Sequence, residues 1–171
     1  MFLRDRELTI RNAAKDDAHT LGEWWRDGAV MAHAGFPLGL DTTDEEIVES
    51  LRGDSDETRR RHIIELDGEP IGEMNYRLLE DGAAEIGIKI CRADKQEKGY
   101  GKRLLRMFIN GLFEMGATKI VLDTNLKNTR AQHVYETLGF RKVRINENAW
   151  TDQLGEPQTS VDYEMFPGDL K

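Results

Sequence analysis

The sequence is poor in cysteine, in proline and in long apolar stretches. Its one cysteine, Cys91, excludes an intramolecular disulfide and a zinc site built from several cysteines. With 4 prolines among 171 residues, the chain contains no proline-rich linker. A membrane-spanning helix needs about 20 consecutive apolar residues, and no such run is present. Hydrophobic residues still make up 39% of the chain and the mean hydropathy is −0.61, values typical of a globular protein.

Basic residues are also in short supply. The chain has 24 Lys and Arg against 32 Asp and Glu, which gives a net charge of −8. This charge repels nucleic acid and anionic membranes at long range, so we expect neither as a partner and favour a cationic small molecule or peptide. The residues from Met1 to Glu7 are too charged for a signal peptide. We therefore expect a cytoplasmic protein that folds as one domain over residues 1–171.

The first half of the chain predicts a short strand, two helices and an antiparallel meander. Leu8 and Ile10 mark the strand, and apolar spacing predicts helices over residues 15–27 and from residue 44 onward. Residues 54–61 are dense in charge, and we expect them to be solvated. Three strands follow because Asp67-Gly68 and Asp81-Gly82 favour tight turns between them; they are predicted over residues 62–66, 71–79 and 84–91.

The second half contains one strand–helix–strand unit. Apolar residues between Leu104 and Phe113 recur at helical spacing, and the strand that follows, 119–124, is predicted to run parallel to strand 84–91. A further helix is expected from Asn128 to Gly139, and a polar loop containing Trp150 is expected between two last strands. The predicted class is α+β, with a mixed, mostly antiparallel sheet of six to seven strands, one internal βαβ unit and about four helices.

A glycine-containing loop opens the helix of that unit; its residues are Gln96, Glu97, Lys98, Gly99, Tyr100, Gly101 and Lys102. Glycine lets a ligand approach the backbone closely, and a helix N-terminus offers unpaired N–H groups with partial positive charge. With the charges of Lys98, Lys102 and Arg103, the loop is predicted to bind an anion such as a pyrophosphate; a simple tight turn is the alternative. Leu104 breaks a Rossmann fingerprint and Arg103 breaks a Walker A motif, so neither fits.

A second segment, residues 128–140, places a tyrosine on the helix that follows the parallel strand pair. Parallel strands often separate near a ligand at their carboxyl ends, so Tyr135 can direct its hydroxyl into the crevice. A tyrosine at such a position more often only packs in the core, and this segment taken alone leaves both interpretations open.

Together the two segments resemble the GNAT superfamily of acetyl-CoA-dependent N-acetyltransferases. Gln96, Gly99 and Gly101 match the Q/R-x-x-G-x-G/A pyrophosphate loop of that family. The second segment matches its N-x-x-A-x-x-x-Y-x-x-x-G-F signature through Asn128, Ala131, Tyr135, Gly139 and Phe140. The resemblance covers element order from about residue 8 to 165, and sequence detail from about residue 83 to 140.

The resemblance implies roles for individual residues. The backbone of Lys89, Ile90 and Cys91 would pair with the pantetheine arm of acetyl-CoA, and the N–H groups between Glu97 and Lys102 would hold its pyrophosphate. Asn128 would bond the cofactor near the same arm, and the Tyr135 hydroxyl would lie beside the thioester sulfur. These roles agree with the chemistry, because a strand N–H can stabilise the oxyanion and a tyrosine can protonate the departing thiolate.

An amine nucleophile must also lose a proton, and two carboxylates are candidates for the base. Glu85 lies on the strand before the pyrophosphate loop, at a spacing where some family members have a catalytic glutamate, and Glu73 lies on the neighbouring strand. We interpret Cys91 as a buried strand residue and not as a nucleophile. The four histidines show no metal-ligand spacing, so no metal is expected.

The leading functional hypothesis is direct transfer of an acetyl group from acetyl-CoA to a primary amine. The acceptor classes left open are a small cationic amine such as a polyamine, an antibiotic, an amino acid, and a protein N-terminus or lysine. The alternative is a non-catalytic acyl-CoA-binding sensor or interaction module. The sequence leaves the oligomeric state open, a homodimer included.

Overall fold

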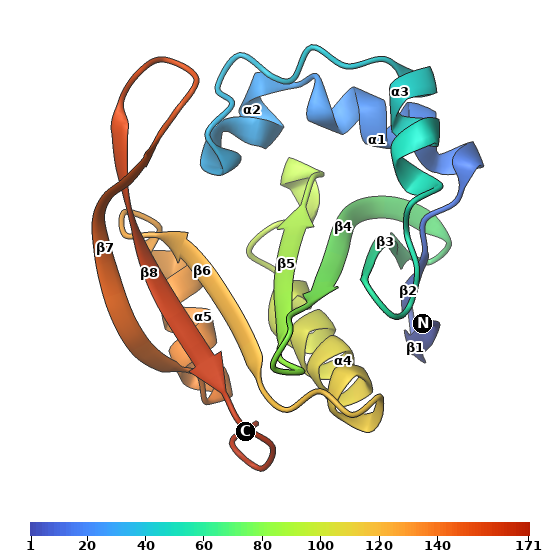
Figure 1. Ribbon diagram of the computed structural model, residues 1–171. Helices are drawn as coiled ribbons and strands as arrows, with labels where there is room; N and C mark the ends of the chain where they lie inside the picture. Colours follow the sequence, from blue (N-terminus) through green and yellow to red (C-terminus); the bar gives the residue numbers. More distant parts are fainter.

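A computed structural model describes all 171 residues and is built around one eight-stranded sheet. The strand order across the sheet is β1-β2-β3-β4-β5-β6-β8-β7 (Figure 1). The strands are β1 (Leu3–Asp5), β2 (Leu8–Asn12), β3 (Arg59–Leu66), β4 (Glu69–Leu78), β5 (Ala84–Ile90), β6 (Ile120–Asn125), β7 (Arg141–Thr151) and β8 (Pro157–Met165). All neighbouring pairs are antiparallel except β5 and β6, which are parallel and joined through a helix. The mixed, mostly antiparallel α+β class is therefore confirmed.

Helices cover both faces of the sheet. The α-helices are α1 (Ala18–Trp25), α2 (Gly28–Met31), α3 (Asp44–Leu51), α4 (Tyr100–Glu114) and α5 (Thr129–Leu138). Figure 1 shows α1, α2 and α3 together on one side, with α4 and α5 on the other. No helix combines the length and apolar character that crossing a bilayer requires.

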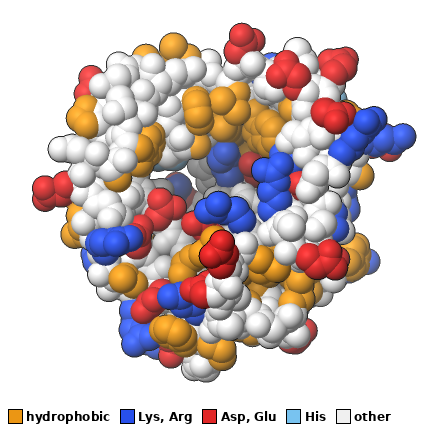
Figure 2. Space-filling model, viewed as in Figure 1, with side chains coloured by type: hydrophobic (Ala, Val, Ile, Leu, Met, Phe, Trp, Pro, Cys, Tyr) orange, Lys and Arg blue, Asp and Glu red, His pale blue; other side chains and the backbone are white.

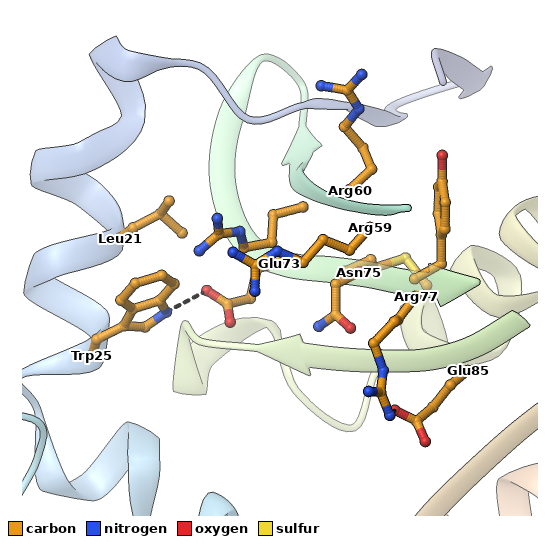
Figure 3. Close-up of a pocket in the computed structure, with 11 residues that line it drawn as sticks. Leu21, Trp25, Arg59, Arg60, Glu73, Asn75, Arg77 and Glu85 are labelled. Carbon is orange, nitrogen blue, oxygen red and sulfur yellow. Dashed lines mark hydrogen bonds and ion pairs between the residues drawn. The ribbon is translucent and has the colours of Figure 1, made fainter. Parts of the chain in front are cut away.

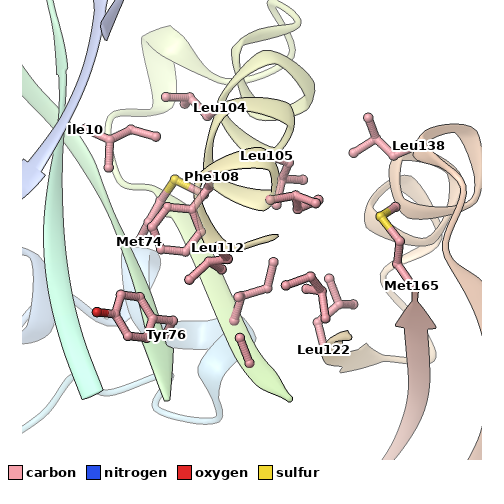
Figure 4. Close-up of a cluster of buried hydrophobic side chains, with 14 of the residues drawn as sticks. Ile10, Met74, Tyr76, Leu104, Leu105, Phe108, Leu112, Leu122, Leu138 and Met165 are labelled. Carbon is pink, nitrogen blue, oxygen red and sulfur yellow. The ribbon is translucent and has the colours of Figure 1, made fainter. Parts of the chain in front are cut away.

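The main core lies between the sheet and α4. Leu104, Leu105, Phe108 and Leu112 on one face of α4 are buried against the sheet (Figure 4), as the helical spacing predicts. A smaller apolar cluster on the opposite face of the sheet joins α1 and α3 to Ile63 of β3. The turn at Asp67 and Gly68 is also confirmed, because both residues have positive φ, 50° and 83°.

The structure departs from the predicted elements in several places, beginning with α2 over Gly28–Met31, a fifth helix that was not predicted. The sheet has eight strands and not six to seven, because Leu3–Asp5 adds an edge strand to β2. Trp150 is not in a loop: it pairs with Gln158 inside the long hairpin of β7 and β8. Residues 54–61 are not simply solvated, because β3 begins at Arg59 and the Asp54 side chain is only 2% exposed.

Strands β5 and β6 separate soon after they meet. Their parallel pairing is limited to Ala84 with Ile120 and Glu85 with Val121, whereas β4 pairs with the whole of β5. Beyond Glu85 the two strands diverge, and the β6 side of β5 becomes an unpaired strand edge inside the sheet. We call the opening between β5 beyond Glu85 and β6 beyond Val121 the wedge. It is the feature of the fold that positions the candidate site.

Candidate active site

The unpaired edge of β5 presents backbone groups in a defined alternation. Cys91 N–H donates to Ile71 O at 2.8 Å on the β4 side, and Ala84 N–H donates to Lys119 O at 2.9 Å on the β6 side. Since successive residues of a strand point their N–H and C=O groups to opposite edges, Ile88 and Ile90 face the wedge. Lys89 and Cys91 then face β4, so of the three residues expected along the pantetheine arm only Ile90 directs its backbone to the wedge, and of that backbone the N–H is free while the C=O accepts from Gln96 Nε2.

The loop that follows β5 holds a run of unpartnered donors. None of the backbone N–H groups from Glu97 to Lys102 donates to an acceptor within the protein. Glu97 and Gly99 have positive φ, 58° and 82°, which curls the loop before α4 begins. A Cβ placed on Gly101 would meet only Ile90 Cδ1, at 3.9 Å, so the loop surface is open there. Such a curl of free N–H groups at a helix N-terminus is a cradle for an anion.

Two lysines make the cradle electropositive. Lys98 and Lys102 form no ion pair, so both ammonium groups are free for a ligand. The acidic side chain of the loop, Glu97, is neutralised by Arg130 of α5. Arg103 does not contribute as expected, because its guanidinium pairs with Glu7 and Asp5 at the turn between β1 and β2.

Gln96 and Asn128 use part of their hydrogen-bonding capacity to fix the backbone. The Gln96 side-chain amide donates to Ile90 O at 2.8 Å, which ties the loop to the end of β5. Asn128 Oδ1 accepts from Ala131 N–H at 3.2 Å and caps α5. The capping role of Asn128 is confirmed, and its amide nitrogen stays free for a ligand.

Tyr135 lies on α5 with its ring held by aromatic neighbours. The rings of Phe140 and Tyr163 pack edge-on against it, at centroid distances of 5.9 and 5.7 Å. Its hydroxyl has no hydrogen-bond partner within the protein. Burial, with a contribution from the charge of Asp123, raises the pKa of Tyr135 to about 12. The phenol therefore keeps its proton at neutral pH and is available as a donor.

Glu73 and Glu85 occupy different environments on the face of the sheet opposite α4. Glu85 pairs with Arg77 at 2.9 Å and is 45% exposed. Glu73 is 15% exposed and accepts from Trp25 Nε1 at 2.7 Å, while Lys89 Nζ lies 3.8 Å from it. Both candidate bases are thus already bound to a donor or cation.

Asp123 of β6 is a carboxylate that the sequence analysis missed. It lies two residues beyond the last parallel pair, on the same strand face as Val121, and forms no ion pair. The Asp123 side chain is exposed at the sheet surface, but desolvation by its neighbours, followed by the nearby charges of Asp162 and Glu85, raises its pKa above the ordinary value. Sequence periodicity could not identify Asp123 as a site residue, because its position at the candidate site depends on where β5 separates from β6.

The remaining reactive side chains do not form a second centre. Cys91 is buried, and burial raises the pKa of its thiol, which disfavours a nucleophilic thiolate. No group of three His, Cys, Asp or Glu side chains is arranged to hold a metal ion.

The tip of the β7–β8 hairpin bridges to the segment after α2. Gln153 N–H donates to Gly35 O at 2.8 Å, and the Gln153 side chain bonds Leu38 N–H and Gly39 O. A Cβ on Gly35 would lie 2.4 Å from the Trp150 ring, so close packing requires glycine there. Figure 1 shows this tip beside α2, and Figure 2 shows a hollow near the centre of the same face.

This arrangement suits an extended ligand that carries a diphosphate at one end. The cradle offers free N–H groups to an anion, and the unpaired edge of β5 offers backbone groups to an extended chain. The class defined by this fold and site is an α+β protein with an anion cradle directly after an unpaired strand edge.

Comparisons with known proteins identify the family. Residues 7–141 match the model of the acetyltransferase (GNAT) domain, and the chain belongs to this family, which confirms the resemblance seen in the sequence. The chain is 33% identical over 66 residues to a [ribosomal protein bS18]-alanine N-acetyltransferase of Haemophilus ducreyi. That match covers 39% of this chain and 46% of the relative, so it spans less than half of the relative's length.

Solved structures agree in fold over almost the whole chain. A spermidine N-acetyltransferase from Vibrio cholerae, in complex with CoA and spermine, has a TM-score of 0.86 at 20% identity and covers 96% of this chain and 98% of its own. The RimL ribosomal L7/L12 alpha-N-protein acetyltransferase, in complex with coenzyme A, has a TM-score of 0.83 at 17% identity and covers 97% and 98%. At these identities the likeness concerns the fold.

Proposed function

We propose that residues 1–171 act as one N-acetyltransferase domain that transfers the acetyl group of acetyl-CoA to a primary amine. The observation that carries this proposal is the run of free N–H groups from Glu97 to Lys102, directly after the unpaired edge of β5. A purely structural turn would have satisfied some of these donors within the protein.

The residues of the site fit coenzyme A. The N–H groups of the loop, with Lys98 and Lys102, would hold the pyrophosphate, and Ile90 would pair with the pantetheine arm. Gln96 would keep the loop against β5, and the free amide of Asn128 would bond the same arm. When bound, acetyl-CoA supplies an activated acetyl thioester.

The chain's own residues account for the proton and charge movements. A free N–H of β5 is available to stabilise the oxyanion that develops during amine attack. Tyr135, protonated at neutral pH, would donate from its hydroxyl to the sulfur as the carbon–sulfur bond breaks. The amine must shed one proton to a base.

Three carboxylates are candidates for the base, and Glu73 is the least available because Trp25 and Lys89 hold it. Glu85 is the candidate from the sequence, but its carboxylate forms an ion pair with Arg77. Asp123 is the candidate from the structure, since it is unpaired and its raised pKa makes it a stronger base than an ordinary aspartate. Glu85→Gln and Asp123→Asn separate these two, because only loss of the base removes the acidic limb of the kcat/KM pH profile.

The acceptor is proposed as a primary amine without further detail at this point. Relatives are named for spermidine and for ribosomal protein N-termini, and both substrates offer such an amine. The alternative, a non-catalytic acyl-CoA-binding module, predicts binding of the carrier without turnover.

A thermal-shift experiment tests carrier binding separately from catalysis. Coenzyme A at about 100 times its Kd should stabilise the protein by about 2.7 kcal/mol, while NAD and ATP should not. Gly101→Leu should abolish this shift, because its side chain enters the cradle without clashing with the protein. Gly53→Leu is the matched control, since Gly53 also has room for a Cβ, with its nearest atoms at 3.7 Å. An unchanged shift in Gly101→Leu would exclude the loop as the binding site.

Turnover is then measured with acetyl-CoA and a panel of primary amines. Release of coenzyme A that depends on the amine supports the enzyme. Carrier binding with no release across the panel supports the binding module instead.

A further inference from the structure

A second recognition surface lies on the sheet face that carries Glu73 and Glu85. Here the sheet borders a pocket of about 320 Å³, walled by Leu21 and Trp25 of α1 (Figure 3). Its lining includes four arginines of β3 and β4, namely Arg59, Arg60, Arg61 and Arg77. Arg60 is paired with Asp56 at 2.9 Å. A row of arginines is unexpected in a chain whose net charge is −8.

Two of these arginines lie directly opposite each other. Arg59 and Arg77 are register partners across β3 and β4, an arrangement in which like charges destabilise a strand pair. Their side chains are 54% and 61% exposed, so no burial or packing of their stems explains the pairing. Each has one carboxylate nearby: Asp54 lies 3.8 Å from Arg59, and Glu85 lies 2.9 Å from Arg77. Both guanidinium groups keep N–H donors that are free for an anion from outside the protein.

A third arginine is fully used within the protein. Arg61 donates to both carboxylate oxygens of Asp54 and to the side chain and backbone of Ser50. The Arg59 guanidinium approaches Asp54 only to 3.8 Å and donates no hydrogen bond. Arg77 donates a single hydrogen bond, from Nη2 to Glu85. These three guanidinium groups therefore share two carboxylates, which leaves one positive charge uncompensated.

The acidic groups of this surface are not free to bind a cation. Glu85 is paired with Arg77, and Glu73 is held by Trp25 and Lys89. A polyamine placed here would meet two exposed guanidinium groups and no unpaired carboxylate.

We propose that this pocket binds a carboxylate carried by the acetyl acceptor itself, with Arg59 and Arg77 as the anion-binding pair. The acceptor class is then an amine that also bears a carboxylate, such as an acidic peptide N-terminus or an amino acid, and not a polycation. Guanidinium groups bind carboxylates with paired, charge-assisted hydrogen bonds. The proposal rests on the proposed acetyltransferase function.

The position of the pair relative to the wedge supports one acceptor that spans both. Glu85 lines this pocket and also the neighbouring cavity that contains Asp123. Asp123, unpaired and next to the wedge, would face the amine end of the acceptor, and the arginine pair would face its acidic end. A bound acceptor would therefore meet opposite charges at its two ends.

The test compares matched acceptors in two separate readouts. Three C-terminally amidated tetrapeptides share a free N-terminal alanine and carry Glu, Gln or Lys at the second and third positions. A small-molecule arm compares γ-aminobutyrate with 1,4-diaminobutane. Calorimetry in the presence of coenzyme A measures binding without turnover, and kcat/KM with acetyl-CoA measures catalysis.

The expected result is a preference for the Glu peptide over the Gln peptide of roughly tenfold to a hundredfold, the effect of one charged hydrogen-bonded contact. Arg59→Gln and Arg77→Gln should reduce this ratio to near one. Arg141→Gln is the matched control, because Arg141 is 62% exposed on β7, away from the pocket, and should leave the ratio unchanged. Arg59→Glu should shift the preference toward the Lys peptide.

Each outcome decides between the two proposals. The arginine pair is refuted as an anion site if the Gln or Lys peptide binds as tightly as the Glu peptide or more tightly. It is also refuted if the preference for the Glu peptide persists in Arg59→Gln, or if no peptide or small molecule binds. Turnover of all acceptors at equal kcat/KM refutes the anion site and still supports the proposed acetyltransferase activity. Selective binding of acidic acceptors without turnover supports the anion site and refutes the enzyme. Preference in only one arm shows whether the carboxylate belongs to a peptide or to a small molecule.

Discussion

The most unusual polar side chain in the core is a histidine, and it makes stability depend on pH. His62 of β3 is fully buried, and neither ring nitrogen has a hydrogen-bond partner. Its ring lies 5.7 Å from that of Tyr76 and 5.1 Å from that of Phe108, centroid to centroid. Burial, helped by the positive charge of the amino terminus, lowers the pKa of His62 from 6.5 to about 4. The fold therefore accommodates only the neutral imidazole.

The direction and size of the effect follow from linkage. Between pH 6.5 and about 4 the unfolded chain binds a proton at His62 that the folded protein does not. Protonation then favours unfolding, so stability falls as the pH decreases through this window and is unaffected above it. The two pKa values differ by about 2.5, which corresponds to a limiting loss of about 3 kcal/mol below pH 4. At pH 5.5 the expected loss is about 1.4 kcal/mol.

Urea denaturation followed by circular dichroism at pH 7.5 and 5.5 measures this loss. His62→Leu keeps a similar volume and removes the titrating group, so it should lose about 1.4 kcal/mol less than the parent between the two pH values. Carboxylates and other histidines titrate in both proteins and cancel in the difference. Parallel losses in the parent and in His62→Leu would refute the reasoning.

Three further substitutions have defined outcomes. Tyr135→Phe should lower kcat by about 10²-fold with the coenzyme A thermal shift retained, and an unchanged kcat would remove the phenol from the mechanism. Asp54→Ala should cost about 3 kcal/mol in urea unfolding, because Arg61, 19% exposed, loses its partner; a cost below about 1 kcal/mol, as for a surface pair, would contradict this. Gly139→Ala should lower the free energy of unfolding by more than the roughly 1–2 kcal/mol that a left-handed alanine costs. The φ angle at this position is 109°, and the new Cβ would lie 2.1 Å from Asp169 O. An unchanged free energy of unfolding would show that the end of α5 can rearrange.

Local patterns in the sequence were sufficient for the elements that depend on local physics. The apolar face of α4, the positive-φ turn at Asp67 and Gly68, and the Asn128 cap all depend on residues within a few positions of one another. The loop from Gln96 to Lys102 was predictable for the same reason, because a glycine-rich helix start is encoded in consecutive residues.

Features that depend on distant pairing were not predictable. The short strand β1 exists because β2 offers a free edge, and the contact of Gln153 with Gly35 joins positions far apart in the chain. The role of Asp123 depends on where β5 leaves β6, and the facing of Arg59 with Arg77 depends on the β3–β4 register. Each of these features requires knowledge of which residues of two strands are opposite each other.

The acceptor is where composition and structure disagree, and the distance over which charge acts explains why. A net charge of −8 creates a field that repels an acidic acceptor, but at physiological ionic strength such fields decay over about 8 Å. A carboxylate bound to Arg59 or Arg77 would lie in direct contact with the guanidinium, far inside this length, so salt screens that attraction much less than it screens the net charge. Net charge therefore governs how fast an acidic acceptor arrives, while Arg59 and Arg77 govern how long it stays. Specificity follows the second quantity, so local pairing and not overall charge is the guide to the substrate of this site.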